Sequence, residues 1–215
     1  MTKIIIFRIA IFTIFLLLSY LLSANYQDMI GFALVLSVGL IHGANDLLII
    51  KKNSKFSSNY SQFWYFFAYV GLVLIGFTFF YFFPSFALIV FIIVSVYHFG
   101  EQHLEAIPIT RSLKNNYRFI SIVSHGIILF TIIFINNINT VNNVFLSFKI
   151  NFLNSNTLNI ILITASIVYI STLVINKYLT SLIFSEILFF VLFYFLSLTS
   201  TLILCFSVYF IFFHS

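Results

Sequence analysis

The sequence predicts an all-α protein, a polytopic bundle of about eight transmembrane helices with its N-terminus in the cytoplasm. Hydrophobic residues make up 62% of the 215 residues and charged residues only 7%, whereas a soluble domain carries roughly a quarter charged residues. Backbone groups in lipid must be paired within their own segment, so the spans are expected to be helices. The long apolar runs do not alternate as β-barrel strands do. We therefore expect residues 1–215 to form a single integral membrane domain.

Eight apolar runs follow one another, and most approach the roughly 20 residues that a helix needs to cross a bilayer. They cover residues 4–24, 29–50, 63–83, 86–104, 118–135, 157–175, 178–196 and 199–215. Pro84 separates the third run from the fourth, and Pro108 follows the fourth. The Asn-rich stretch 136–156 is predicted to be a loop with a short interfacial helix at 144–153. The first run is long for the core of a signal peptide and lacks a good cleavage site, which favours a span.

The positive residues indicate the orientation, because cytoplasmic loops of membrane proteins are enriched in Lys and Arg. The outer loops hold only Lys149 when the N-terminus is placed inside. The inner segments then hold Lys3, Arg8, Lys51, Lys52, Lys55, Arg111, Lys114, Arg118 and Lys177. We therefore expect a multi-pass protein of the inner (plasma) membrane of the cell.

Several classes of function are disfavoured by the composition. The net charge of +5 does not indicate a nucleic-acid partner, because the basic residues lie between the spans. The sequence contains no glycine-rich phosphate-binding motif. The single cysteine, Cys205, excludes an internal disulfide and a cysteine-based zinc site.

Ionisable residues interrupt the apolar pattern at three places, over 39–50, 95–105 and 209–215. Such residues are costly inside hydrocarbon and by default mark a functional site. The predicted topology places all the histidines in the cytoplasmic half of the bilayer. These histidines are His42, His98, His103, His125 and His214. Imidazole is the commonest side-chain metal ligand, so histidines at one depth indicate a metal site.

Helical spacing places a carboxylate beside two of these histidines. Asp46 lies four residues after His42, and Glu101 lies three residues after His98, so each pair shares a helix face. A carboxylate in this position can orient an imidazole through its second nitrogen, although Asp46 could equally form an interhelical hydrogen bond. His103 lies five residues after His98 and points well away from it, so we expect His103 at the rim of the bundle.

Two further positions, His125 and Glu186, have more than one interpretation. His125 is either a metal ligand or a residue that contacts the ligands rather than the metal. Glu186 lies near the middle of the seventh run, where a carboxylate is costly; it can pair with a histidine, relay protons or be a protonated packing residue. Glu105 is expected at a solvated helix end, and Glu101 could equally lie at one. The aromatic residues that we expect to line a cavity for a long apolar substrate are Tyr97, Phe99 and Tyr209.

The chain resembles the Brp/Blh family of membrane β-carotene dioxygenases. Residues 39–46 match its G-L-x-H-G-A-x-D block, residues 97–101 match its Y-H-F-G-E block, and residues 209–215 match its closing aromatic stretch with His-Ser. The order and approximate separation of these blocks agree over nearly the whole chain. The resemblance implies a non-haem Fe(II) enzyme that adds O2 across the central 15,15′ double bond of β-carotene. Two retinal molecules would be released and would serve a rhodopsin-type protein.

The same resemblance implies a set of site residues. His42, His98 and His214 are expected to bind the iron, while Asp46 and Glu101 orient the imidazoles. The closing motif of the family has one more histidine, four residues after the one that matches His214, and the sequence ends at Ser215. We expect either a C-terminally truncated form or another residue in that place, and His125 is the candidate for the fourth ligand.

Two other classes of function use buried histidines or carboxylates in a helical membrane protein. A membrane di-iron desaturase or hydroxylase would carry more histidines than the five present here, arranged in HxxxH and HxxHH clusters. A small membrane transporter or quinone-binding protein would use Asp46, Glu101 and Glu186 as an intramembrane relay and would bind no iron. The metal content of the purified protein separates this second class from an oxygenase.

Overall fold

The computed structural model describes residues 2–37, 59–105, 107, 115–175 and 180–213. Nearly all of these residues are helical and none lies in a strand, which confirms the predicted all-α class. The helices are α1 (Thr2–Leu21), α3 (Asn59–Phe82), α4 (Pro84–Glu105), α5 (Asn115–Asn136), α6 (Ile138–Ser147), α7 (Ser155–Ile175), α8 (Thr180–Thr199) and α9 (Leu202–Phe212), with residues 24–37 helical as well.

Several of these helices suit a lipid bilayer. Within the described ranges, those long and apolar enough to cross a membrane are Pro84–Glu105, Asn116–Asn136, Ser155–Ile175 and Leu182–Thr199. Shorter apolar helices cover Ile6–Leu21, Val70–Phe82 and Leu202–Phe212. A helical membrane bundle is thereby confirmed, while the count of eight spans and the cytoplasmic N-terminus stay predictions.

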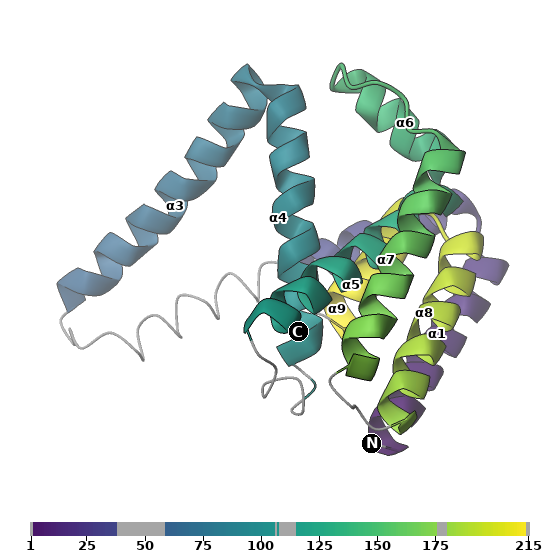
Figure 1. Ribbon diagram of the computed structural model, residues 1–215. Helices are drawn as coiled ribbons and strands as arrows, with labels where there is room; N and C mark the ends of the chain where they lie inside the picture. The colour runs from purple at the N-terminus through teal and green to yellow at the C-terminus, as the bar shows by residue number, and fades with distance from the viewer. Residues whose placement is uncertain (1, 38–58, 106, 108–114, 176–179, 214–215) are drawn as a thin grey trace.

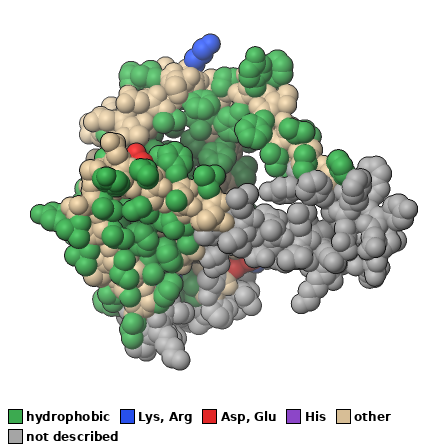
Figure 2. Space-filling model, turned by 180° about the vertical axis from the view of Figure 1, so that it is seen from behind, with side chains coloured by type: hydrophobic (Ala, Val, Ile, Leu, Met, Phe, Trp, Pro, Cys, Tyr) green, Lys and Arg blue, Asp and Glu red, His purple; other side chains and the backbone are tan. Residues whose placement is uncertain are grey.

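Large hydrophobic side chains cover the outside of the molecule. On the face in Figure 2, Lys, Arg, Asp and Glu side chains are few and lie apart from one another among hydrophobic ones. Leu72, Ile93 and Ile160 are each more than 60% exposed. Monomeric soluble proteins rarely expose large contiguous apolar patches. This surface therefore suits the hydrocarbon of a bilayer.

Helix α5 lies at the centre of the bundle (Figure 1). It packs against α4 on one side and against α7 on another, and it also contacts α8 and α9. Helix α1 runs along α8, whereas α3 joins the bundle through α4 and leans away from the other helices in Figure 1. The described core consequently lies where α1, α4, α5, α7, α8 and α9 meet.

Two glycines bring α4 and α5 into backbone contact. A Cβ atom added to Gly100 would lie 2.0 Å from the carbonyl oxygen of Ile122, and one added to Gly126 would lie 1.9 Å from that of Val96. Small residues allow helices in membranes to approach this closely. The contact fixes the separation of α4 and α5 next to the histidines that both helices carry.

The short helix of the Asn-rich stretch begins earlier than predicted. Helix α6 covers Ile138–Ser147 rather than 144–153, and only Asn137 separates it from α5. Lys149 has a φ of 58°, in the left-handed region where a helix cannot continue. The Asn142 side chain then binds the backbone of Leu153 twice, donating at 3.3 Å and accepting at 2.8 Å, and fixes the return of the chain.

Gln27 joins the end of α1 to the start of α9. Its amide nitrogen donates to the carbonyl oxygens of Ser19 at 2.7 Å and Leu22 at 3.1 Å, and its oxygen accepts from the backbone N–H of Thr201 at 2.8 Å. Gln27 is only 4% exposed, so water cannot replace these bonds. We expect Gln27→Leu to lower the free energy of unfolding by about 2 kcal/mol or more, because an unpaired buried polar group costs about 1–3 kcal/mol.

Thermal unfolding in detergent checks this expectation. Thr78→Val is the matched control, because the Thr78 hydroxyl is exposed and donates only to Leu74 of its own helix at 2.8 Å. A surface change of this kind is expected to alter stability by no more than about 0.5 kcal/mol. Equal melting temperatures for Gln27→Leu and the parent protein would contradict the role given to Gln27.

Candidate functional site

Ionisable side chains from separate helices meet in the core of the bundle. This buried polar cluster consists of Arg8 (α1), His103 (α4), His125 (α5), Tyr169 (α7) and Glu186 (α8), and none of them is more than 8% exposed. Arg8 and Glu186 lie near the starts of their helices, whereas His103 lies near the end of its helix. These three positions share one depth only if α1 and α8 run opposite to α4, as the predicted alternation of spans requires.

Glu186 is the centre of the cluster. Its Oε1 accepts a hydrogen bond from Arg8 Nη1 at 2.9 Å. Its Oε2 lies 2.9 Å from His103 Nε2 and accepts the Tyr169 hydroxyl at 3.0 Å. Arg8 Nη1 also reaches the carbonyl oxygen and the hydroxyl of Ser185, at 3.4 Å and 3.2 Å. Of the roles predicted for Glu186, the structure shows pairing with a histidine, and it adds a buried arginine.

Arg8 completes the cluster. The prediction that Arg8 is one of the basic residues at the inner membrane surface is therefore wrong. Its Nη2 lies 3.4 Å from His103 Nε2, and its guanidinium carbon lies 5.0 Å from the centre of the Phe189 ring. One imidazole nitrogen cannot both donate to Glu186 and accept from Arg8. The shorter contact indicates that Nε2–H donates to the carboxylate. The sequence signal for this role was an arginine inside the apolar run 4–24.

His103 and His125 form a stacked pair. Their ring centres lie 4.0 Å apart with an angle of 26° between the rings. The prediction that His103 lies at the rim is wrong, because its side chain is 2% exposed. The common depth expected of the histidines is confirmed for this pair. Neither ring nitrogen of the fully buried His125 has a hydrogen-bond partner, and such a group calls for a water or an ion.

The donors of the cluster resemble a metal site in type and spacing. Each of His103, His125 and Glu186 offers a ligand atom within 4.8 Å of the others, and two histidines with one carboxylate are typical of non-haem Fe(II). Arg8 argues against a metal here. Its guanidinium stays protonated in proteins and already contacts both Glu186 and His103. A divalent ion would face this fixed positive charge in a medium of low dielectric constant. The cluster as it stands therefore does not suit a metal.

The opposite face of α4 carries a second group of polar residues. Tyr97, His98 and Glu101 line a cavity of about 820 Å³ whose other lining residues, from α4 and α5, are apolar. The Tyr97 hydroxyl donates to Glu101 Oε1 at 3.1 Å. Phe99 and Tyr209 do not belong to this cavity, because they are 4% and 0% exposed and pack in the core. There the Tyr209 hydroxyl donates to the Phe99 carbonyl oxygen at 3.2 Å.

His98 and His103 lie on different faces of α4, as their spacing predicted. His98 is therefore separated from the buried polar cluster. The group of potential metal ligands in the described part of the chain does not include His98. The other residues of the predicted iron site, His42, Asp46 and His214, lie outside the described residues. Glu105 lies at an exposed helix end, as expected, where it pairs with Arg118 at 2.9 Å.

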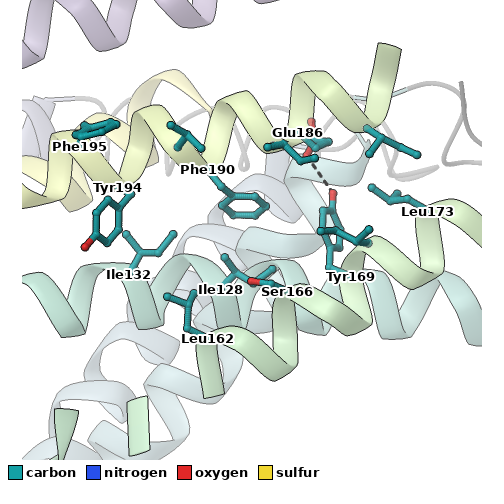
Figure 3. A pocket seen from close by; sticks show the side chains of 14 residues that line it. Ile128, Ile132, Leu162, Ser166, Tyr169, Leu173, Glu186, Phe190, Tyr194 and Phe195 are labelled. Atoms are coloured by element: carbon teal, nitrogen blue, oxygen red, sulfur yellow. Dashed lines mark hydrogen bonds between the residues drawn. The ribbon is translucent and has the colours of Figure 1, made fainter. Parts of the chain in front are cut away.

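A further cavity borders the buried polar cluster. It has a volume of about 400 Å³ and is lined by α5, α7 and α8. Figure 3 shows the hydrogen bond between Tyr169 and Glu186 near one end of the cavity, and apolar side chains such as Ile132 and Leu162 farther along it. Tyr169 and Glu186 already bind each other, and the other polar lining residues are Ser166 and Tyr194, so the free surface of this cavity is mostly apolar.

Comparison with known protein families identifies the family of this chain. A family model described as Beta-carotene 15,15'-dioxygenase matches residues 33–215. The chain belongs to this family. No match was found among curated proteins or among solved structures.

Membership of the β-carotene 15,15′-dioxygenase family makes the chain a carotenoid-cleaving oxidoreductase. The resemblance noted from residues 39–46 and 97–101 is thereby confirmed. The matched region includes His98 and Glu186, but it begins after Arg8. The charge partner of Glu186 therefore comes from outside the matched region.

Proposed function

We propose that this chain adds O2 across the central 15,15′ double bond of β-carotene and releases two retinal molecules, at a histidine-ligated non-haem iron. The observation that carries the proposal is the family match over residues 33–215. The apolar exterior supports it, because a rigid apolar rod such as β-carotene is supplied by the bilayer itself. We further propose that the enzyme lies in the inner (plasma) membrane and that its retinal passes to a rhodopsin-type protein.

The proposed iron ligands are His42, His98 and His214. His98 can be tested against the structure. Its imidazole lies on the exposed face of α4 beside a large cavity, with a carboxylate, Glu101, on the same wall. The His98 imidazole can therefore serve as a metal ligand, and the cavity leaves room beside it for the metal and its other ligands. We leave His125 out of the proposed ligand set, because its ring stacks on His103 in the cluster that contains Arg8. When bound, the iron would activate O2.

The residues of the chain itself would bind the substrate and hold the ligands in place. The apolar wall of the cavity beside His98, with Ile92 and Phe119 among its residues, suits a polyene and excludes water. The Tyr97 hydroxyl holds the Glu101 carboxylate at 3.1 Å. In the proposed site, Glu101 orients the imidazole of His98. Oxidative cleavage needs no general acid or base, so Tyr97 and Glu101 have only positioning roles.

Expression in a bacterial host that makes β-carotene tests the proposal. We expect the orange colour to fade and retinal to appear by chromatography, with about one iron per folded chain after gentle purification. His98→Ala is expected to reduce both retinal and bound iron at least about tenfold. Removing a residue that only hydrogen-bonds to a metal ligand already lowers metal affinity or activity about 10–100-fold, and His98 is proposed as a ligand itself. Glu105→Gln, a change of an exposed carboxylate on the same helix, is the matched control and should leave both unchanged.

Two results would contradict the proposal. Folded protein in the membrane that leaves the carotenoid intact would refute the activity. Retinal formation that survives His98→Ala with full iron content would refute the assignment of His98.

A further inference from the structure

The segment of α4 that carries His98 is held by several helices at once. Tyr209 of α9 donates to the carbonyl oxygen of Phe99. Gly100 lies against the backbone of α5. His103 binds Glu186 of α8 at 2.9 Å, and Arg8 of α1 lies 3.4 Å from the same imidazole nitrogen. Glu105 of α4 also pairs with Arg118 of α5, but at an exposed helix end. His103 makes the buried contact with the charged residues of α1 and α8, so it is the electrostatic anchor of this segment.

Helix α4 needs such an anchor because apolar burial sets its rotation only weakly. Its residues are apolar on most sides, and lipid tails are as apolar as the core, so turning the helix costs little hydrophobic free energy. His98 and His103 are five residues apart, which places them about 140° apart around the helix. Holding His103 in the core consequently fixes the direction in which His98 points.

The charges within the cluster balance without a metal. Arg8 and Glu186 form a buried pair at 2.9 Å, with side chains 10% and 3% exposed. Tyr169 and His103 satisfy the second carboxylate oxygen. Removing one partner of a buried ion pair would leave an uncompensated buried charge. The guanidinium thus has the place that a metal ion would need among these donors.

We propose that Arg8 is the resident cation of the buried polar cluster and that, through Glu186 and His103, it fixes the rotation of α4 so that His98 faces its cavity. Arg8 and Glu186 are then positioning residues of the enzyme, although neither touches the substrate. The part of this inference that concerns catalysis rests on the proposed role of His98.

The first test measures the position of α4 directly. Spin labels are attached to Ile89→Cys on α4 and Leu198→Cys on α8, which are 44% and 51% exposed. The native Cys205 is fully buried and will not take a label. The distance distribution is compared between the labelled parent and the same chain with Arg8→Met and Glu186→Met, which removes both charges together. We expect a shifted or clearly broadened distribution. An unchanged distribution would overturn the positioning role.

The second test measures iron and retinal per folded chain in the same double variant. Loss of outer partners of a metal site typically lowers metal affinity or activity about 10–100-fold, and we expect a reduction of at least tenfold. Turnover per folded chain equal to the parent would mean that the cluster only stabilises the fold. The single substitution Arg8→Lys keeps the positive charge and is expected to retain most of the activity of the parent chain. The matched control is Glu105→Gln with Arg118→Gln, which removes an exposed pair between α4 and α5 and should change neither the distance nor the turnover.

The third test asks whether a metal occupies the cluster. His103→Gln keeps a hydrogen-bond donor for Glu186 but removes the imidazole that a metal would bind. We therefore expect bound metal to be kept in His103→Gln and lost in His98→Ala when folded protein is compared. Metal that remains in His98→Ala and is lost in His103→Gln would overturn the assignment of Arg8 as the cation. The failure of the proposed function is a separate outcome: a parent chain that makes no retinal refutes the reaction, and the label distances still report on Arg8.

Discussion

Gly100→Ala is expected to leave little or no folded protein. The added methyl would lie 2.0 Å from the carbonyl oxygen of Ile122 and 2.8 Å from its carbonyl carbon. Both are backbone atoms of a packed helix, so they cannot move aside as the end of a flexible side chain can. Relief requires α4 and α5 to separate, which would also break the contact at Gly126. We expect a loss of at least about 4 kcal/mol, at the upper end of single-substitution effects.

Two glycines of α3 provide the matched controls for this substitution. A Cβ atom added to Gly71 or to Gly76 meets nothing within 4 Å. Alanine at these positions is therefore expected to be neutral or stabilising by up to about 1 kcal/mol, because glycine is the poorer helix former. The measurement is the amount of monodisperse protein that survives extraction and heating in detergent. A normal yield and melting temperature for Gly100→Ala would show that α4 and α5 do not approach as closely as described.

The positions of the helices could be predicted because each span needs a long apolar run. The apolar run 157–175 corresponds to α7 (Ser155–Ile175), and the run 86–104 corresponds to α4 (Pro84–Glu105). The error at α6 has a local cause. Nothing in the Asn-rich stretch marks where a helix begins, since its polar residues fit a loop and a surface helix equally well. The end of α6 depends on the backbone at Lys149, which the composition does not reveal.

The candidate site was harder to predict because the helices lack a polar face. Spacing correctly placed His98 and His103 on different sides of α4. Which side faces the core could not be decided, since a helix that is apolar all round carries no periodic signal for burial. Arg8 shows the second limit. Its partner Glu186 lies 178 positions away in the sequence, so a charge-counting rule assigned Arg8 to the surface.

Glu186→Gln is expected to lower the free energy of unfolding by about 3–5 kcal/mol, the range found when one partner of a buried ion pair is removed. Glutamine keeps the size of the side chain but not its charge, so the buried guanidinium of Arg8 loses its counter-ion at 2.9 Å. His103 and Tyr169 also lose a charged acceptor. Water cannot compensate, because the side chain of Glu186 is 3% exposed.

Glu105→Gln is the control that separates burial from charge. Glu105 pairs with Arg118 at the same 2.9 Å, but the two side chains are 48% and 32% exposed. An exposed pair contributes about 0–1 kcal/mol, so unfolding in SDS should distinguish the two substitutions clearly. Equal effects would show that Glu186 is protonated or solvated rather than paired with Arg8. If Arg8→Met added to the Glu186→Met chain recovers stability relative to Glu186→Met alone, the loss came from the unpaired cation, because removing both charges leaves no buried charge to solvate.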